Sequence, residues 1–183
     1  MDELHILGGH NHENAMAAIA ITHRMGVPVD VIRKTLLEFR AVEHRIEFVE
    51  EIAGVAYYND SKGTNPDAAI KGIQAMNRPT YLIGGGYDKG SEYDEWIEAF
   101  DGKVKELVLI GVTAQKIADC ARKHGFEHIV FADSLEDAVK ECAARAGSGD
   151  AVLLSPACAS WDMFKSFEQR GELFKKYVRD LMA

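Results

Sequence analysis

Short apolar runs alternate with helix-like stretches along most of this chain, and this alternation constrains the fold more than any other feature. From Ile46 onward the strand-like runs are 46–52, 55–58, 79–83, 106–110, 129–132 and 151–154. Helices are predicted for 93–100, 113–124 and 134–146, and a helical region is predicted for 162–182, with Gly171 as its point of interruption. Short apolar strands separated by helices of about ten residues form βαβ units. The pattern therefore predicts an α/β fold with a mostly parallel sheet and flanking helices.

The beginning of the chain follows a different pattern. The first two strand-like runs are joined by Ala53-Gly54, which predicts an antiparallel hairpin at one side of the sheet. Helices are predicted before them for 14–25 and 29–39, and two helices alone cannot bury a core. We therefore expect a short helical tail of another domain over residues 1–41, followed by a Rossmann-like domain over residues 42–183.

Composition excludes several classes of protein. The 183 residues carry 21 basic and 29 acidic side chains, for a formal net charge of −8, which argues against nucleic-acid binding. No apolar run approaches the roughly 18 residues that a membrane span needs. The three cysteines lack CxxC spacing and are too few for a disulfide framework. We expect a reduced, cytoplasmic, monomeric protein without a metal site, membrane insertion or nucleic-acid partner.

Polar residues follow the second strand of the hairpin. Asp60, Lys62 and Thr64 alternate, so an extended backbone would point all three the same way. Asn65 and Pro66 then suit the N-cap and first turn of a helix. A carboxylate, an ammonium and a hydroxyl beside a helix N-terminus suit a polyol and an anion. The alternative is an ordinary strand-to-helix loop with a surface Lys-Asp pair.

Two later strands also end in distinctive loops. Gly84-Gly85-Gly86 precedes Lys89, and three glycines allow close approach to a ligand, although a plain turn fits equally well. The last strand precedes the run 155–160, in which Ser160 suits a helix cap or a hydroxyl donated to a carboxylate. Cys158 in this run is interpreted as a core cysteine, because no activating base lies beside it in the sequence.

Two further segments carry polar groups. In the run 9–14, the two histidines lack the helical spacing of a metal motif, and loop or capping roles suit Asn11 and Asn14. Arg45, just before the hairpin, is a surface cation or a bidentate phosphate ligand.

Taken together, the runs 9–15, 44–45, 60–65, 85–90 and 155–160, extended by Phe164, Phe167 and Arg170-Gly171, resemble the Mur ligase family. Within that family they are most similar to the members that add D-glutamate. The resemblance implies a cytoplasmic ATP-dependent ligase of peptidoglycan synthesis, and hence of cell wall biogenesis, with ATP and Mg²⁺ as cofactors. Its partners would be D-glutamate and UDP-N-acetylmuramoyl-L-alanine, joined through an acyl phosphate.

The resemblance also implies residue roles. Asn11 and Asn14 would contact adenine, Arg45 the phosphates and Asp60 the ribose, while Lys62 would be catalytic near the transferred phosphate or the incoming amino acid. The carboxylates of D-glutamate would bind to the side chains of Thr64, Lys89 and Ser160, with Phe167 packing nearby.

One departure from the family is large. No G-x-x-x-x-G-K-[ST] motif occurs in the sequence, so we expect a C-terminal fragment that is inactive by itself and leaves Mg²⁺ mainly to a missing central domain. The alternatives are another Mur ligase, a folylpolyglutamate synthetase-type ligase, or a non-catalytic nucleotide- or amino-acid-binding module. A dinucleotide-dependent oxidoreductase is opposed by the lack of GxGxxG after any predicted strand.

Overall fold

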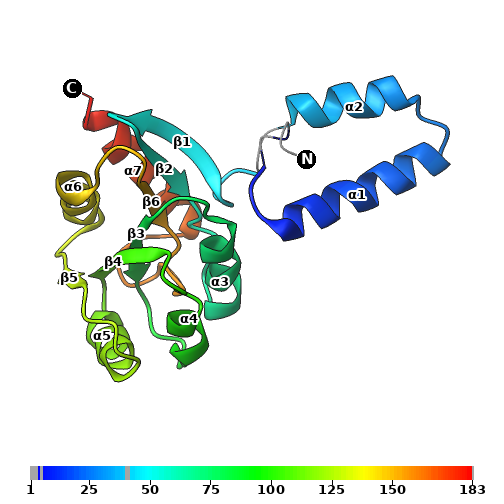
Figure 1. Ribbon diagram of the computed structural model, residues 1–183. Helices are drawn as coiled ribbons and strands as arrows, with labels where there is room; N and C mark the ends of the chain where they lie inside the picture. The colour runs from blue at the N-terminus through cyan, green and yellow to red at the C-terminus, as the bar shows by residue number, and fades with distance from the viewer. Residues whose placement is uncertain (1–3, 5, 40–41, 183) are drawn as a thin grey trace.

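A six-stranded sheet forms the centre of the α/β part of the molecule. The computed structural model describes residue 4, residues 6–39 and residues 42–182, apart from the side chain of His10. The strands lie in the order β1-β2-β6-β3-β4-β5, with β1 antiparallel to β2 and every other pair parallel (Figure 1). Their bounds are β1 Glu47–Ile52, β2 Val55–Asn59, β3 Thr80–Gly85, β4 Val104–Ile110, β5 Ile129–Phe131 and β6 Ala151–Leu154. The predicted mostly parallel sheet with one antiparallel strand is confirmed.

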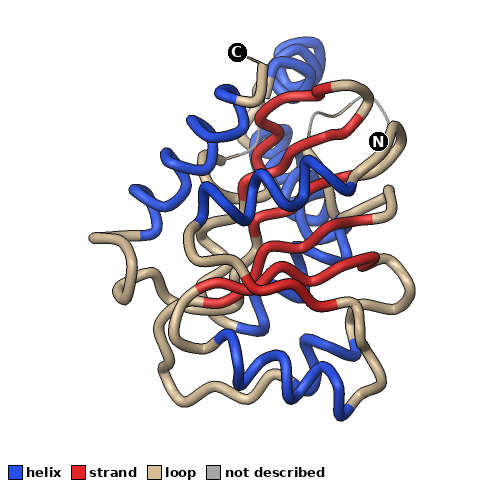
Figure 2. Tube along the Cα trace, turned by 90° about the vertical axis from the view of Figure 1, so that its left-hand side faces the viewer, coloured by secondary structure: helices blue, strands red, loops and turns tan. Residues whose placement is uncertain are grey.

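Helices cover both faces of this sheet. Figure 2 shows the strands side by side with the helices around them. Alternate residues of β4 enter different core clusters, Leu107 and Leu109 on one face and Val108 and Ile110 on the other. The first face is covered by α3 Pro66–Ala75, α4 Asp94–Glu98 and α5 Ala114–Lys123, and the second by α6 Leu135–Arg145 and α7 Phe167–Asp180.

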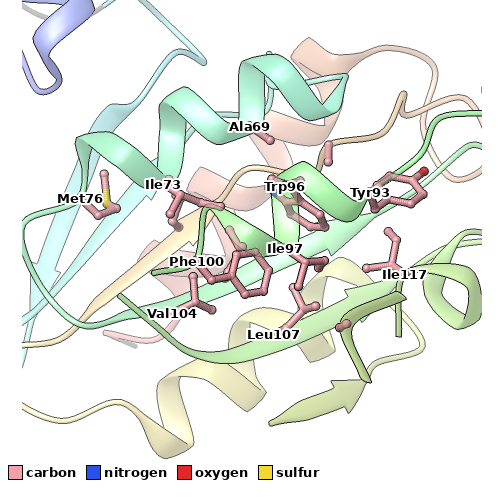
Figure 3. Packing of buried hydrophobic residues seen from close by; sticks show 14 of the residues in the cluster. Ala69, Ile73, Met76, Tyr93, Trp96, Ile97, Phe100, Val104, Leu107 and Ile117 are labelled. Atoms are coloured by element: carbon pink, nitrogen blue, oxygen red, sulfur yellow. The ribbon is translucent and has the colours of Figure 1, made fainter. Parts of the chain in front are cut away.

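Aromatic side chains fill the first of these two cores. Trp96 is fully buried, and its ring meets Phe100 edge-on with centroids 5.5 Å apart. Ile73 of α3 and Leu107 of β4 lie close to them (Figure 3). Burying a large aromatic side chain stabilises a fold by roughly 1.5–3 kcal/mol, so this cluster fixes α3 and α4 against the sheet.

Local sequence signals explain several element boundaries. Ala53 and Gly54 both have positive φ, 51° and 81°, which matches the primed turn that suits a two-residue hairpin. Asn65 accepts a hydrogen bond from the Ala68 amide at 2.9 Å, and Ser134 accepts one from Asp137 at 3.1 Å. Both residues therefore act as the N-caps that the sequence predicts.

Two helix boundaries differ from the prediction. α1 spans Gly9–Arg24, so Asn11 and Asn14 lie inside the helix and not in a loop or at its cap. α7 begins at Phe167 and not at residue 162, because Ser166 caps it by accepting from the Gln169 amide at 3.3 Å. α7 also continues through Gly171 without a break.

The first two helices, α1 and α2 Val29–Glu38, form a hairpin that stands beside the α/β part (Figure 1). Many of its large apolar side chains are exposed, including Met16, Ile21, Met25 and Val29. The predicted domain boundary at residue 41 falls outside the described residues, so it stays a prediction. Among the helices that the structure describes, none is both long and apolar enough to cross a lipid bilayer.

Candidate functional site

The candidate site lies at the carboxyl ends of adjacent parallel strands. The chain leaving β2 is held to β6, because the Asp60 amide donates to the Leu154 carbonyl at 2.7 Å. The end of β3 is held to the loop after β6, because the Gly85 amide donates to the Pro156 carbonyl at 2.9 Å. Ligands of open α/β sheets bind at such an edge, outside the carboxyl ends of the strands. The polar loops singled out in the sequence therefore gather at one edge.

Arg170 of α7 holds two of these loops together from beneath. The side chain is only 1% exposed. Its guanidinium donates to Ser61 at both the hydroxyl (2.9 Å) and the carbonyl (2.8 Å), and to the Cys158 carbonyl at 3.1 Å. Burial lowers the pKa of Arg170 to about 10, a value at which it still carries its charge at neutral pH. A buried arginine with a planar fork of donors thus fixes the spacing of the loops after β2 and β6.

Asp60 lies inside the site and does not point outward with Lys62. The chain turns here, with the Gly63 amide donating to the Asp60 carbonyl at 2.8 Å, so the predicted extended backbone is wrong. Ser155 Oγ donates to Asp60 Oδ2 at 2.7 Å, and the Ile46 amide donates to Oδ1 at 3.3 Å. Burial raises the pKa of Asp60 to about 7, although both of these hydrogen bonds favour the charged form.

A small pocket opens above the Asp60 carboxylate. Its volume is about 60 Å³, and its polar walls come from the basic side chains of Arg45, Lys62 and Lys71 together with Asp60. Arg45 itself is exposed, between His44 and Ile46, which both have positive φ. Three cations around one buried carboxylate make this spot suited to a ligand that offers hydroxyl groups and negative charge.

Lys62 and Phe167 meet although they are far apart in the sequence. Lys62 is exposed, and its Nζ lies 5.4 Å from the centroid of the Phe167 ring, within cation–π range. Phe167 is the first residue of α7, and its carbonyl accepts from the Ser61 hydroxyl at 2.8 Å. The structure therefore brings these two predicted site residues together.

Lys89 reaches the loop after β2 from the loop after β3. Its ammonium donates to the Thr64 carbonyl at 2.7 Å, and its side chain is otherwise exposed. Tyr87, two residues earlier, pairs with Ala159 in a short antiparallel bridge, which places the Lys89 loop beside the Ser160 loop. Ser160 is only 2% exposed, so its hydroxyl lies within the site floor and not on the rim.

Two of the glycines before Lys89 allow the backbone of their loop to pack closely against neighbouring backbone. Gly85 and Gly86 have φ values of 100° and 144°, which L side chains rarely adopt. A Cβ at Gly86 would collide with the Ala159 carbonyl, and one at Gly85 would collide with Ile110. These glycines therefore let the loop after β3 lie directly against its neighbours.

Cys158 is a core residue, as the sequence suggested. It is 1% exposed, with Sγ 3.1 Å from Tyr93 Oη and 3.3 Å from Thr113 Oγ1. Burial raises the pKa of its thiol. A nucleophilic cysteine needs the opposite shift.

Asn11 and Asn14 belong to α1 and not to these loops, and they lie on one face of that helix. They line a pocket of about 320 Å³ between α1, α2 and Val42, whose remaining walls are mainly apolar and include Phe39. Asn11 already donates to the Leu7 carbonyl at 2.7 Å, which leaves its side-chain oxygen available to a ligand. Asn14 is exposed.

Several residues of the site carried no predicted role. Arg170, Ser155, His44 and Asn59 are buried and organise the loops around them. Asn59 Nδ2 lies 3.0 Å from both His44 Nδ1 and Glu47 Oε2, and so ties the entry to β1 to the end of β2. The one signal available was position, because Asn59 and Ser155 directly end or follow apolar strands.

Comparisons with known proteins identify the family. A family model described as Mur ligase, glutamate ligase domain, matches residues 44–158. UDP-N-acetylmuramoylalanine–D-glutamate ligases are similar over almost the whole chain: that of Thermoanaerobacter sp. (strain X514) is 60% identical over 99% of it, and that of Lachnospira eligens is 60% identical over 98%. The chain spans about 40% of the length of these curated relatives.

Solved structures show the same fold at low sequence identity. UDP-N-acetylmuramate–alanine ligase of Thermotoga maritima has a TM-score of 0.72 at 19% identity, covering 97% of this chain and 40% of that one. Folylpolyglutamate synthase of the same organism has a TM-score of 0.60 at 20% identity, covering 84% of this chain and 37% of that one. Because the matched model covers more than half of the sequence, this chain belongs to the Mur ligase family and carries its glutamate ligase domain.

Proposed function

We propose that this chain is the amino-acid-binding part of an ATP-dependent ligase that adds D-glutamate to UDP-N-acetylmuramoyl-L-alanine during peptidoglycan precursor synthesis. The observation that carries the proposal is the convergence of Lys62, Lys89 and Phe167 at one sheet edge, from two loops and the start of α7. The relatives at 60% identity, which are D-glutamate ligases, support it. Their greater length is consistent with a chain that works as part of a larger enzyme.

D-Glutamate presents two carboxylates and one amine. Lys89 already places its ammonium at the Thr64 backbone, so a carboxylate arriving there would receive charge-assisted hydrogen bonds from Lys89 and the Thr64 hydroxyl. The buried Ser160 hydroxyl would serve the other carboxylate, and the Phe167 ring would pack against the methylene groups. Lys62, held over that ring, would stand beside the reacting groups.

A nucleotide would occupy a different set of residues. The pocket at Asn11 and Asn14 has apolar walls and two side-chain amides, which suits a flat heterocycle such as adenine. Asp60 lines the small pocket with lone pairs free on each carboxylate oxygen, so it can accept from ribose hydroxyls while keeping its present partners. Arg45, at the mouth of that pocket, would contact phosphate oxygens.

The proposed reaction is amide formation. The carboxylate of UDP-N-acetylmuramoyl-L-alanine takes the γ-phosphoryl group of ATP, and the amine of D-glutamate then displaces phosphate from the acyl phosphate. Phosphoryl transfer needs mainly positioning and charge neutralisation, which Lys62 and Arg45 would supply from this chain. We assign the binding of Mg²⁺ and of the ATP triphosphate to a P-loop domain. The family resemblance implies such a domain, and this sequence lacks its motif.

The test is substrate choice by the complete ligase that contains this chain. Phosphate release from ATP is measured with UDP-N-acetylmuramoyl-L-alanine and each of D-glutamate, L-glutamate, L-alanine and glycine. Two further reactions pair UDP-N-acetylmuramate with L-alanine and a folate with L-glutamate. Turnover that requires D-glutamate is the expected result. Turnover with UDP-N-acetylmuramate and L-alanine, or with a folate and L-glutamate, would show that the chain serves another ligase of this fold.

A further inference from the structure

A cluster of metal-ligand side chains lies between α4 and α5, outside the loops described above. Cys120 and His124 occur four residues apart on α5, with His124 just past its last turn, and Asp94 opens α4. One ligand atom of each lies within 4.8 Å of the other two. The neighbours Tyr93, Trp96 and Ile97 turn into the core (Figure 3). Asp94 instead contacts His124 at the end of α5.

These three side chains match the ligand preferences of zinc. His124 Nε2 lies 2.8 Å from Asp94 Oδ1. Zinc binds sulfur, nitrogen and carboxylate oxygen at about 2.0–2.3 Å with tetrahedral geometry, which separates ligand atoms by about 3.3–3.8 Å. The cluster needs side-chain movements of about 1 Å or less to reach that spacing. The spacing of Cys120 and His124 also places both on one face of the helix.

Glu98 occupies the position of an outer-shell partner. Its Oε1 lies 3.7 Å from His124 Nδ1, on the opposite side of the ring from Asp94. Ligating histidines usually donate their second ring N–H to a carboxylate, which fixes the tautomer and strengthens the ligand. A single histidine ring is therefore bracketed by one carboxylate that can ligate and another that can orient it.

One lysine lies beside the cluster and does not block it. The Lys123 ammonium lies 3.4 Å from Asp94, but its side chain is 75% exposed and free to swing away. The comparable cluster of Glu43, His44 and Glu172 differs, because the Lys175 ammonium already sits 2.6 Å from Glu43 and 2.8 Å from Glu172.

We propose that Cys120, His124 and Asp94 form a zinc site on the outer side of α4 and α5, with water as the fourth ligand and Glu98 as the outer-shell partner of His124. On binding, the Cys120 thiol gives its proton to solvent and its sulfur forms the Zn–S bond. The ion would join two helices that otherwise pack through the core.

The test uses the 183-residue chain with Zn²⁺ and Co²⁺ alone. Equilibrium dialysis gives stoichiometry and affinity, and Co²⁺ bound to a thiolate adds a charge-transfer band in the near ultraviolet. We expect one ion per chain with that band, and a loss of affinity of at least tenfold in Cys120→Ser and in His124→Gln. Glu98→Gln should weaken binding roughly 10–100-fold. His128→Gln, which alters an exposed histidine outside the cluster, is the matched control and should bind as the parent does.

A second measurement uses the parent chain alone, so its result does not depend on whether the variants fold. Zn²⁺ should protect Cys120 from alkylation, whereas Cys142 and Cys158 are buried and unreactive in either condition. The proposal is overturned if Co²⁺ gives no thiolate band, if the band survives in Cys120→Ser, or if Zn²⁺ leaves the alkylation rate of Cys120 unchanged. Binding without a thiolate band would place the ion on histidines elsewhere, such as His12.

Discussion

Replacing Arg170 by methionine removes the donors that hold the loops after β2 and β6 at their present spacing. The guanidinium makes four hydrogen bonds, two to Ser61, one to the Cys158 carbonyl and one to the Ala159 carbonyl. Ala159 keeps a second donor, the Tyr87 amide at 2.9 Å. The variant therefore leaves the carbonyls of Ser61 and Cys158 buried without this donor. The two loops, which bind substrate in the proposed function, are then no longer connected through the side chain of residue 170.

The cost follows from these contacts. Hydrogen bonds to a charged group contribute about 1.5–3 kcal/mol each, and a buried carbonyl left unpaired costs about 1–3 kcal/mol. Relief of the buried charge offsets part of this, since burial already lowers the pKa of Arg170 to about 10. Removing one member of a buried charged network typically costs about 3–5 kcal/mol, and we expect a loss in that range. The loss in Arg170→Lys should be smaller than that in Arg170→Met but not zero, because lysine keeps the charge and lacks the planar fork of donors.

Urea denaturation followed by the fluorescence of Trp96 and Trp161 measures the loss of unfolding free energy. In a thermal melt of the same variant, the expected fall in Tm is about 6–20 °C for a domain of this size. The matched control is Arg179→Met, an exposed position on the same helix, which should cost under about 0.5 kcal/mol. An Arg170→Met variant within about 1 kcal/mol of the parent would refute the assignment of Arg170 as the tie between the loops.

Three further predictions follow from the same structure. A chain starting at Val42 should stay folded with a Tm within about 3 °C of the parent in a thermal melt, because α1 and α2 pack on each other; an unfolded product would place them in the core. Because the raised pKa of Asp60 lets the folded state keep a proton that the unfolded state loses, the free energy of unfolding should fall from about pH 4 to pH 7. Urea titrations of Asp60→Asn should lack this contribution, and an identical pH dependence would contradict it. The 183-residue chain alone should release no phosphate from ATP with both substrates, since its sequence has no P-loop; turnover near that of a complete ligase would disprove this.

Features set by local chemistry were predictable from the sequence. Continuous apolar runs mark the strands, which are buried on both faces of the sheet, and Ala53-Gly54 fixes the hairpin turn. The side-chain caps at Asn65 and Ser134 mark where helices begin. α1 lacks such a signal, because its N-cap is Gly8 and no side chain caps it, so the sequence predicts its start five residues too late.

Features set by distant contacts were not predictable. Asp60 turns inward because Ser155, which is 95 residues away in the chain, and the Ile46 amide donate to it. Nothing in the local pattern of α7 marks Arg170 as buried, and only the loops that pack over it make it so. Lys62 and Phe167 meet because α7 returns beside β2, which no local pattern indicates.

The amino-acid affinity of Lys89→Ala tests most directly whether the loops at this sheet edge bind D-glutamate. In the complete ligase the KM for D-glutamate should rise roughly tenfold or more, because a charge-assisted contact is lost, while the KM for ATP changes little. Lys176→Ala, an exposed lysine on α7 paired with Asp180, is the control and should leave both constants unchanged. Equal KM values for D-glutamate in Lys89→Ala and the parent would contradict the account, because Lys89 would then serve only to hold the Thr64 backbone.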